Sequence, residues 1–165
     1  MFRRQIITEI IIQASPEEIW RHLTDFAAYP EWNPFIENIE GKAEVGYRLK
    51  VTLAVRGGKE MVFKPVVKAA EPGKKLVWLG RTVFPWLLDG EHSFVIEDQG
   101  DGTCRFVQSE SFTGFLVPYL PKSMGEQTKL GFEMLNKVLK ERVEKEGRSA
   151  EGEGQRELPG DIAPE

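Results

Sequence analysis

Residues 122–145, KSMGEQTKLGFEMLNKVLKERVEK, have the periodicity of one long amphipathic helix. At about 100° per residue, the apolar and small side chains fall on a single stripe. That stripe contains Met124, Thr128, Gly131, Met134, Leu135, Val138 and Leu139. Charged residues such as Lys129, Glu133 and Lys137 lie on the opposite side. A helix of this length extends roughly 35 Å, which is enough to cross a whole sheet.

The preceding residues, 36–114, have the pattern of antiparallel strands. Apolar and polar side chains alternate with a period of two, as in strands that have one buried and one solvated face. Strands are expected at residues 47–55, 61–68, 76–79, 92–96 and 104–112. Turn-forming residues separate them at 57–58, 72–73 and 98–102. The isoleucine-rich residues 2–13 add a sixth strand that can be placed individually, and the whole pattern predicts about seven strands.

A sheet with one apolar face needs a cover, and the helix at 122–145 is the one segment long enough to provide it. We therefore predict an α+β fold in which a curved antiparallel sheet wraps around the long C-terminal helix. The space between the sheet and the helix is the natural place for a cavity.

Two short helices are expected after the first strand. Residues 15–18, SPEE, supply an N-cap serine, a proline at the first helical position and two early acids, which together start a helix. Asp25, Pro30 and Pro34 prevent one long helix. A second short helix or turn is therefore expected at residues 29–35.

The chain has 165 residues and a net charge of −4. Residues 146–165 hold six acids and two bases, a net charge of −4, so residues 1–145 are neutral. A neutral body without basic clustering argues against a nucleic-acid partner. Because apolar residues almost vanish after Gly147, we expect one domain at residues 1–146 and a disordered acidic tail at 147–165.

Several classes of site are absent from the sequence. The one cysteine, Cys104, excludes an internal disulfide. With two histidines and no CxxC, HExxH, GxGxxG or P-loop motif, no metal site and no cofactor are expected. No apolar run reaches the ~20 residues of a membrane span, and Thr8, Glu9 and Gln13 interrupt the signal-like start. We expect a cytoplasmic protein without an integral membrane segment, of undetermined oligomeric state.

Three stretches near the N-terminus resemble a known superfamily. SPEEIW (15–20), LTDF (23–26) and YPEWNPF (29–35) are similar to the opening of the SRPBCC superfamily. These START-like, helix-grip proteins include polyketide cyclases, aromatases and the major birch pollen allergen. Further matches extend the resemblance over about residues 3–145: Gly41, Gly46, the turn Pro72-Gly73 and ESFTG (110–114).

The resemblance, to the polyketide cyclase/dehydrase-like branch, implies the helix-grip fold and a hydrophobic ligand pocket. Our first hypothesis is that the chain binds a small hydrophobic ligand, lipid- or polyketide-like, between the sheet and the helix. The alternative is a cyclase/dehydrase-type enzyme that uses His92 and Glu110 as acid and base. A second alternative is a structural or partner-binding domain without a ligand. Members of the superfamily include transporters, binders and enzymes, so the fold alone does not decide between them.

Inward-facing positions of the strands and the helix supply most of the expected ligand contacts. These are Val51, Phe63, Trp78, Phe94, Gln108, Phe112, Thr128, Gly131 and Leu135. Trp78 fits plain core packing equally well. Gly131 either permits close packing of the helix on the sheet or leaves room for a ligand.

Four further residues are expected near the rim of the cavity. Trp32 and Phe35 either form an aromatic lip or close a small second core. Trp86 lies in a bend beside a proline, where a rim position is expected. Leu116 belongs to the apolar linker 114–121, which either covers the cavity as a lid or packs over the end of the helix.

His92 and Glu110 lie on neighbouring strands and face inward. If the hairpin turn between them centres on Gly100, His92 faces Gln108. A shift of the centre by one residue brings His92 opposite Glu110. A buried carboxyl group needs a partner or a raised pKa. The two residues therefore form either an acid–base pair or a structural polar network.

Overall fold

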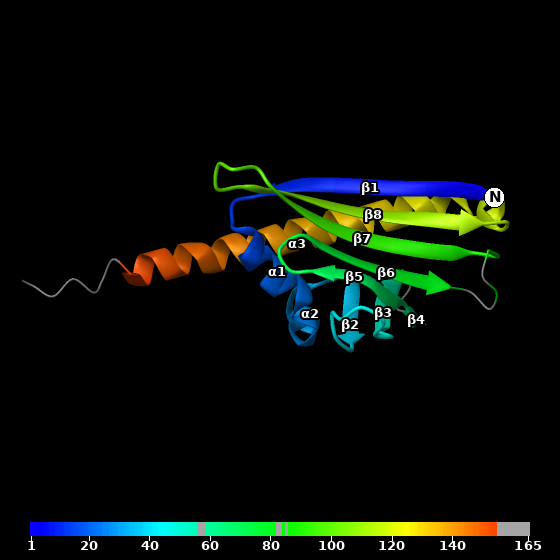
Figure 1. The fold of residues 1–165 in the computed structure, drawn as a ribbon, viewed down its shortest axis with the longest axis horizontal. Helices are drawn as coiled ribbons and strands as arrows, with labels where there is room; N and C mark the ends of the chain where they lie inside the picture. Colours follow the sequence, from blue (N-terminus) through cyan, green and yellow to red (C-terminus); the bar gives the residue numbers. More distant parts are fainter. Residues whose placement is uncertain (56–58, 82–83, 85, 155–165) are drawn as a thin grey trace, which may run out of the picture.

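The computed structural model describes residues 1–55, 59–81, 84 and 86–154. Its elements, in chain order, are β1 (Phe2–Ile12), α1 (Pro16–Thr24), the 3₁₀ turn η1 (Phe26–Ala28), α2 (Tyr29–Trp32), β2 (Ile36–Glu40), β3 (Lys50–Val55), β4 (Lys59–Phe63), β5 (Val66–Glu71), β6 (Lys75–Arg81), β7 (Asp89–Asp98), β8 (Cys104–Gly114), the 3₁₀ turn η2 (Val117–Tyr119) and α3 (Lys122–Gly154). Figure 1 shows α3 running the length of the strands. The predicted α+β helix-grip fold is confirmed.

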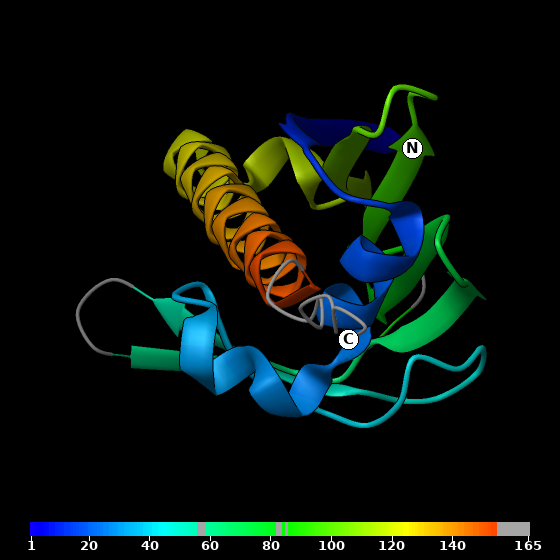
Figure 2. The same ribbon diagram turned by 90° about the vertical axis from the view of Figure 1, so that its left-hand side faces the viewer.

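The described strands form two antiparallel sheets, of order β1-β8-β7-β6-β5 and β2-β3-β4. Residues 46–49 join them, because the backbone N–H of Leu49 donates to the carbonyl oxygen of Pro65 and that of Gly46 to Val67, at 2.8 and 2.9 Å. The two sheets therefore make one curved wall, and α3 lies on its concave side (Figure 2).

The described residues contain eight strands, one more than expected. The predicted strand at 61–68 is two strands, β4 and β5, which belong to different sheets. Pro65 lies at the break between β4 and β5. Proline has no N–H to donate to a neighbouring strand, so a break between strands is a place where it is tolerated. The short strand β2 was not predicted individually.

The first short helix begins as the sequence predicts. The Ser15 hydroxyl accepts a hydrogen bond from the Glu18 N–H (3.3 Å), and the Glu18 carboxylate accepts one from the Ser15 N–H (2.9 Å), which completes a capping box. After α2, the side-chain oxygen of buried Asn33 accepts bonds from the N–H groups of Phe35 and Ile36, at 3.0 and 2.8 Å. This turn fixes the position of Phe35 beside α3.

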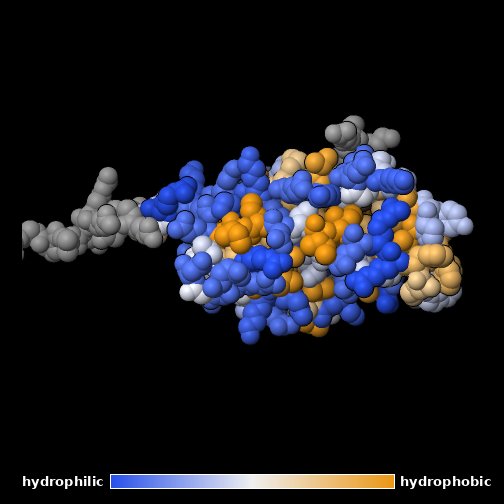
Figure 3. Space-filling model, turned by 90° about the horizontal axis from the view of Figure 1, so that it is seen from above, coloured by the Kyte–Doolittle hydropathy of each residue, from blue (hydrophilic) through white to orange (hydrophobic). Residues whose placement is uncertain are grey.

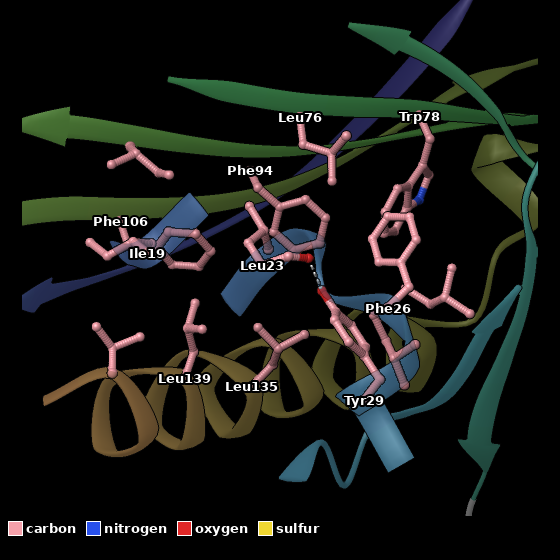
Figure 4. Close-up of a cluster of buried hydrophobic side chains, with 14 of the residues drawn as sticks. Ile19, Leu23, Phe26, Tyr29, Leu76, Trp78, Phe94, Phe106, Leu135 and Leu139 are labelled. Carbon is pink, nitrogen blue, oxygen red and sulfur yellow. Dashed lines mark hydrogen bonds between the residues drawn. The ribbon is translucent and has the colours of Figure 1, made fainter. Parts of the chain in front are cut away.

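The hydrophobic core fills one part of the space between the wall and α3. Figure 4 shows Phe94 and Phe106 of the sheet facing Leu135 and Leu139 of the helix. At the C-terminal end of α1, the buried Tyr29 hydroxyl donates a hydrogen bond to the Leu23 carbonyl oxygen, at 2.7 Å. This bond satisfies the one polar group of the Tyr29 side chain within the core.

The buried face of α3 is rotated from the predicted stripe. Phe132, Leu135, Leu139 and Val143 are buried, whereas Met134 is 50% exposed. The spacing of the apolar residues allows either the predicted stripe or the one containing Phe132 to face the sheet. In the structure, the stripe containing the large Phe132 ring faces it.

The helix α3 also continues beyond the predicted start of the tail. It ends at Gly154, so residues 147–154 are helical, and the rest of the predicted tail, 155–165, lies outside the described residues. A glycine such as Gly147 weakens a helix by only about 1 kcal/mol relative to alanine. None of the described helices has the length and apolar character needed to cross a membrane.

Candidate functional site

A cavity of about 350 Å³ lies between the wall and the first half of α3, beside the core of Figure 4. Most of its lining side chains are apolar, and five of them are Phe or Trp. It is lined by Phe35, Leu53, Met61, Phe63, Lys64, Trp78, Gly80, Arg81, Leu88, Gly90, His92, Glu110, Phe112, Met124, Thr128 and Phe132. The exposed Met61, Lys64 and Arg81 lie where it opens to solvent.

Two glycines form a bare part of the sheet in the cavity wall. Gly80 of β6 and Gly90 of β7 are directly opposite each other across the two strands. A Cβ atom on Gly90 would lie 2.6 Å from Oε1 of Glu110, so a side chain at position 90 would displace that carboxyl group. The two glycines give the cavity its depth and let Glu110 reach it.

His92 and Glu110 are directly opposite each other on β7 and β8. This is the second of the two registers considered above, with Asp98 opposite Cys104 and the turn centred one residue beyond Gly100. Nδ1 of His92 lies 3.3 Å from Oε2 of Glu110, and both side chains are almost fully buried. The structure therefore brings the predicted pair together in the cavity wall.

Gln108 orients the histidine from the other side. Its Nε2 lies 2.9 Å from Nε2 of His92. When the amide donates this bond, the imidazole proton is on Nδ1 and points to Glu110. The His92 ring also stacks on Phe94, with ring centroids 4.4 Å apart, and contacts Phe132, at 4.7 Å. The ring therefore has little freedom to reorient.

Burial makes both titratable groups neutral near pH 7. Desolvation, with a smaller contribution from the negative charge of Glu91, raises the pKa of Glu110 to about 8. Desolvation lowers the pKa of His92 to about 3. Glu110 thus holds a proton, and its Oε2 can accept from His92 while the acid O–H faces the cavity. The buried wall offers a hydrogen-bond donor without a charge.

Seven predicted site residues line the cavity: Phe35, Phe63, Trp78, His92, Glu110, Phe112 and Thr128. Thr128 uses its hydroxyl proton within the helix, donating to the Met124 carbonyl oxygen at 2.8 Å. Its contribution to the wall is therefore mostly steric.

The other predicted contacts lie away from the cavity. Val51, Phe94, Gln108 and Leu135 are fully buried in the core or in the polar network. Phe94 and Leu135 do face inward, but there they pack against other core side chains (Figure 4). Trp32 packs against Tyr29, with ring centroids 4.9 Å apart, so it lies at the edge of the hydrophobic core and does not line the cavity.

Trp86 and Leu116 are exposed and do not line the cavity. Gly131 permits close packing, because the ring of Phe35 covers it. Of the two alternatives for Gly131, this contact favours close packing, and Gly131 is not among the residues that line the cavity.

Nine lining residues were not predicted: Leu53, Met61, Lys64, Gly80, Arg81, Leu88, Gly90, Met124 and Phe132. A signal existed for Gly80 and Gly90, since glycine inside a strand often marks a place where a ligand or another chain segment comes close. Among the described residues, no group of three or more His, Cys, Asp and Glu side chains is arranged to hold a metal ion.

Comparison with known proteins relates this geometry to one family. The family model described as polyketide cyclase/dehydrase and lipid transport matches residues 3–147. No curated protein sequence matches the chain.

Three solved structures share the fold. The di-domain ARO/CYC StfQ from the steffimycin biosynthetic pathway has a TM-score of 0.71 at 11% identity, over 88% of this chain and 52% of StfQ. The chain thus spans about half of StfQ. A START superfamily protein from Mycobacterium smegmatis gives 0.66 at 22% identity, over 86% of this chain and 97% of that one. Ara h 8.0201 gives 0.67 at 20%, over 87% and 99%. At sequence identities this low, the similarity to these structures shows only that the fold is shared.

The raised pKa of Glu110 predicts a loss of stability as the pH rises from 6.5 to 8. The folded state keeps the Glu110 proton up to about pH 8, whereas the unfolded chain loses it near 4.5, so the stabilisation is full below pH 4.5 and is lost through pH 8. His92 has the opposite sign below pH 6.5, because unfolding lets it take up a proton. Above that pH, the Glu110 contribution remains.

Urea unfolding of the wild type, Glu110→Gln and the exposed control Glu37→Gln between pH 6.5 and 8.5 checks this prediction. We expect Glu110→Gln to flatten the slope and Glu37→Gln to keep it. An unchanged slope in Glu110→Gln would show that Glu110 is ionised at neutral pH.

Two glycines of α3 should respond in opposite ways to alanine. A Cβ atom at position 131 would lie 2.5 Å from two ring carbons of Phe35, whereas one at position 125 would meet only Ile6, at 4.0 Å. Gly131→Ala should therefore cost about 1–3 kcal/mol and push Phe35 toward the cavity. Gly125→Ala should gain up to about 1 kcal/mol. Thermal unfolding of both variants measures the difference; equal stabilisation would contradict the close contact with Phe35.

Proposed function

The chain belongs to the polyketide cyclase/dehydrase and lipid transport family, and on that basis we propose that it binds one small, mostly apolar molecule, lipid- or polyketide-like, in the cavity beside α3. The observation that carries this proposal is the cavity itself. Its volume of about 350 Å³ is in the range of small-molecule sites, which are concave, mostly apolar and supplied with a few polar groups.

The buried polar groups favour a ligand with a hydrogen-bond acceptor. The protonated carboxyl group of Glu110 can donate to a carbonyl or ether oxygen. A ligand anion at that depth is disfavoured, because it would lose its hydration among apolar side chains. An apolar molecule with one neutral oxygen, such as a ketone or an ester, matches the wall best.

Filling the cavity should abolish ligand binding. A Cβ atom on Gly80 would have its nearest neighbours at 3.7 Å, in Gly90 and Phe63, so a larger side chain there can extend into the cavity. We expect Gly80→Phe to weaken binding of the neutral fluorescent probe N-phenyl-1-naphthylamine on the order of tenfold or more. The control Ser93→Phe adds the same ring to the outer face of β7 and should bind like the wild type. Equal affinity of all three proteins would place the probe elsewhere.

A second candidate function is acid catalysis on a ketone, and the contact between His92 and Glu110 favours it. A carboxyl group with a pKa near 8 can protonate a carbonyl oxygen at neutral pH. His92 is a poor base, because its pKa is lowered to about 3 and its Nε2 faces Gln108. This combination suits binding and polarisation of a carbonyl group better than proton abstraction.

The two candidates differ in the effect of replacing the pair. If the pair only binds a ligand, the double variant His92→Phe/Glu110→Leu should lose less stability than either single variant. Each single change leaves the other side chain buried without a hydrogen-bond partner, at a cost of about 1–3 kcal/mol. If Glu110 is a general acid, wild-type protein should cyclise or dehydrate a linear triketide thioester, and Glu110→Leu should lose on the order of 100-fold in rate. Mass spectrometry of the thioester and urea unfolding measure both. Measurable turnover by the wild type would contradict a pure binder.

A further inference from the structure

Five of the exposed large apolar residues lie in the two segments that follow β6 and β8. Exposed fractions are 58% for Phe84, 57% for Trp86, 56% for Phe115, 38% for Leu116 and 81% for Tyr119. They follow β6 and β8, whose ends lie at the right-hand end of Figure 1 together with the start of α3. We call these five residues the aromatic surface. Monomeric proteins rarely expose large contiguous apolar patches without a binding role.

Hydrogen bonds hold the aromatic surface together. The N–H of Phe115 donates to the carbonyl oxygen of Trp86, and that of Leu116 to Leu87, both at 3.1 Å. Residues 86–87 and 115–116 are therefore held side by side. Trp86 has a φ of +62°, a left-handed conformation that large side chains adopt only at an energetic cost. Core packing does not explain this strained backbone conformation, because the indole ring of Trp86 is exposed to solvent.

The aromatic surface adjoins the opening of the cavity. Leu88, two residues after Trp86, lines the cavity, as does Met124 at the start of α3. Arg81, at the end of β6, lines the same cavity and is 54% exposed.

Positive charge borders the aromatic surface, although the whole chain carries −4. Residues 111–125 contain Lys122 as their one charged residue. A second groove beside them is lined by Arg4, Lys122 and Lys129, with Glu126 as its one acid. The guanidinium of Arg4 donates to the carbonyl oxygen of Leu120, at 3.1 Å, so this groove is adjacent to η2. At the right-hand end of Figure 3, pale residues of intermediate hydropathy lie next to strongly hydrophilic residues, drawn in deep blue.

We propose that this end of the protein docks on an anionic lipid bilayer. Exposed Trp, Tyr and Phe side chains favour the headgroup layer, and nearby Lys and Arg side chains attract anionic lipids. A second copy fits less well, because face-to-face contact would bring the basic grooves together. Docking would also open the cavity toward the lipid phase; that last consequence rests on the proposed function.

Sedimentation with lipid vesicles tests the docking surface without any cavity ligand. Full-length protein is mixed with vesicles of phosphatidylcholine alone or of equal parts phosphatidylcholine and phosphatidylglycerol. We expect binding to the anionic vesicles that weakens with added salt. Trp86→Ser with Tyr119→Ser should reduce the partition coefficient on the order of tenfold. Lys122→Glu should reduce binding to the anionic vesicles alone.

A matched control removes exposed apolar surface elsewhere. Ile11 and Met134 are 47% and 50% exposed, and Ile11→Ser with Met134→Ser should sediment like the wild type. The docking proposal is wrong if wild-type protein stays in the supernatant, or if the control pair loses as much binding as the aromatic pair. It is also wrong if the aromatic pair only abolishes a dimer detected by ultracentrifugation. Binding of N-phenyl-1-naphthylamine by the same variants reports separately on the cavity.

Discussion

One helix, α3, has to cover the whole concave side of a wall made from two sheets. It packs closely against one part of the wall and leaves a cavity beside another part, and that cavity is the candidate site. Where Phe94 and Phe106 face Leu135 and Leu139, the side chains are buried in one hydrophobic cluster. Toward the start of α3, the opposed glycines of β6 and β7 leave the wall bare, and a cavity of about 350 Å³ remains. The packing that stabilises one end of the molecule thus also shapes the site at the other.

The same enclosure controls the chemistry of the cavity. Burial keeps the Glu110 proton in place up to about pH 8 and keeps His92 neutral, so the pair is uncharged at pH 7. Gln108 and the Phe94 ring hold the imidazole in one orientation. A fixed, neutral donor in an aromatic cavity is suited to a neutral oxygen on an apolar molecule. It is poorly suited to a charged ligand, which would have to lose its hydration.

The sequence predicted the architecture because the signals for it are local. The period of α3, the alternation in the strands and the SPEE helix start each reflect neighbouring residues, and each is found in the structure. The division of residues 61–68 between two sheets depends on Pro65 and on the distant residues 46–49.

The site was predicted less completely, for a physical reason. Alternation tells which side chains face inward, but not whether a neighbour fills the space in front of them. Val51, Phe94 and Leu135 therefore entered the prediction although they are core residues. The pairing of His92 with Glu110 required the hairpin register, which the sequence left open between two choices. The covering of Gly131 by Phe35 is a contact between distant segments, which no local pattern contains.

The central claim is that Glu110 is a neutral acid in the wall of a ligand cavity. It can be tested most directly by a carboxyl ¹³C NMR titration of Glu110, with and without the neutral ketone 2-decanone. We expect a midpoint near pH 8 in the free protein and a change in the Glu110 resonance when the ketone binds. A midpoint near the ordinary value of 4.5, with no response to the ketone, would contradict both the neutral acid and its place in the binding site.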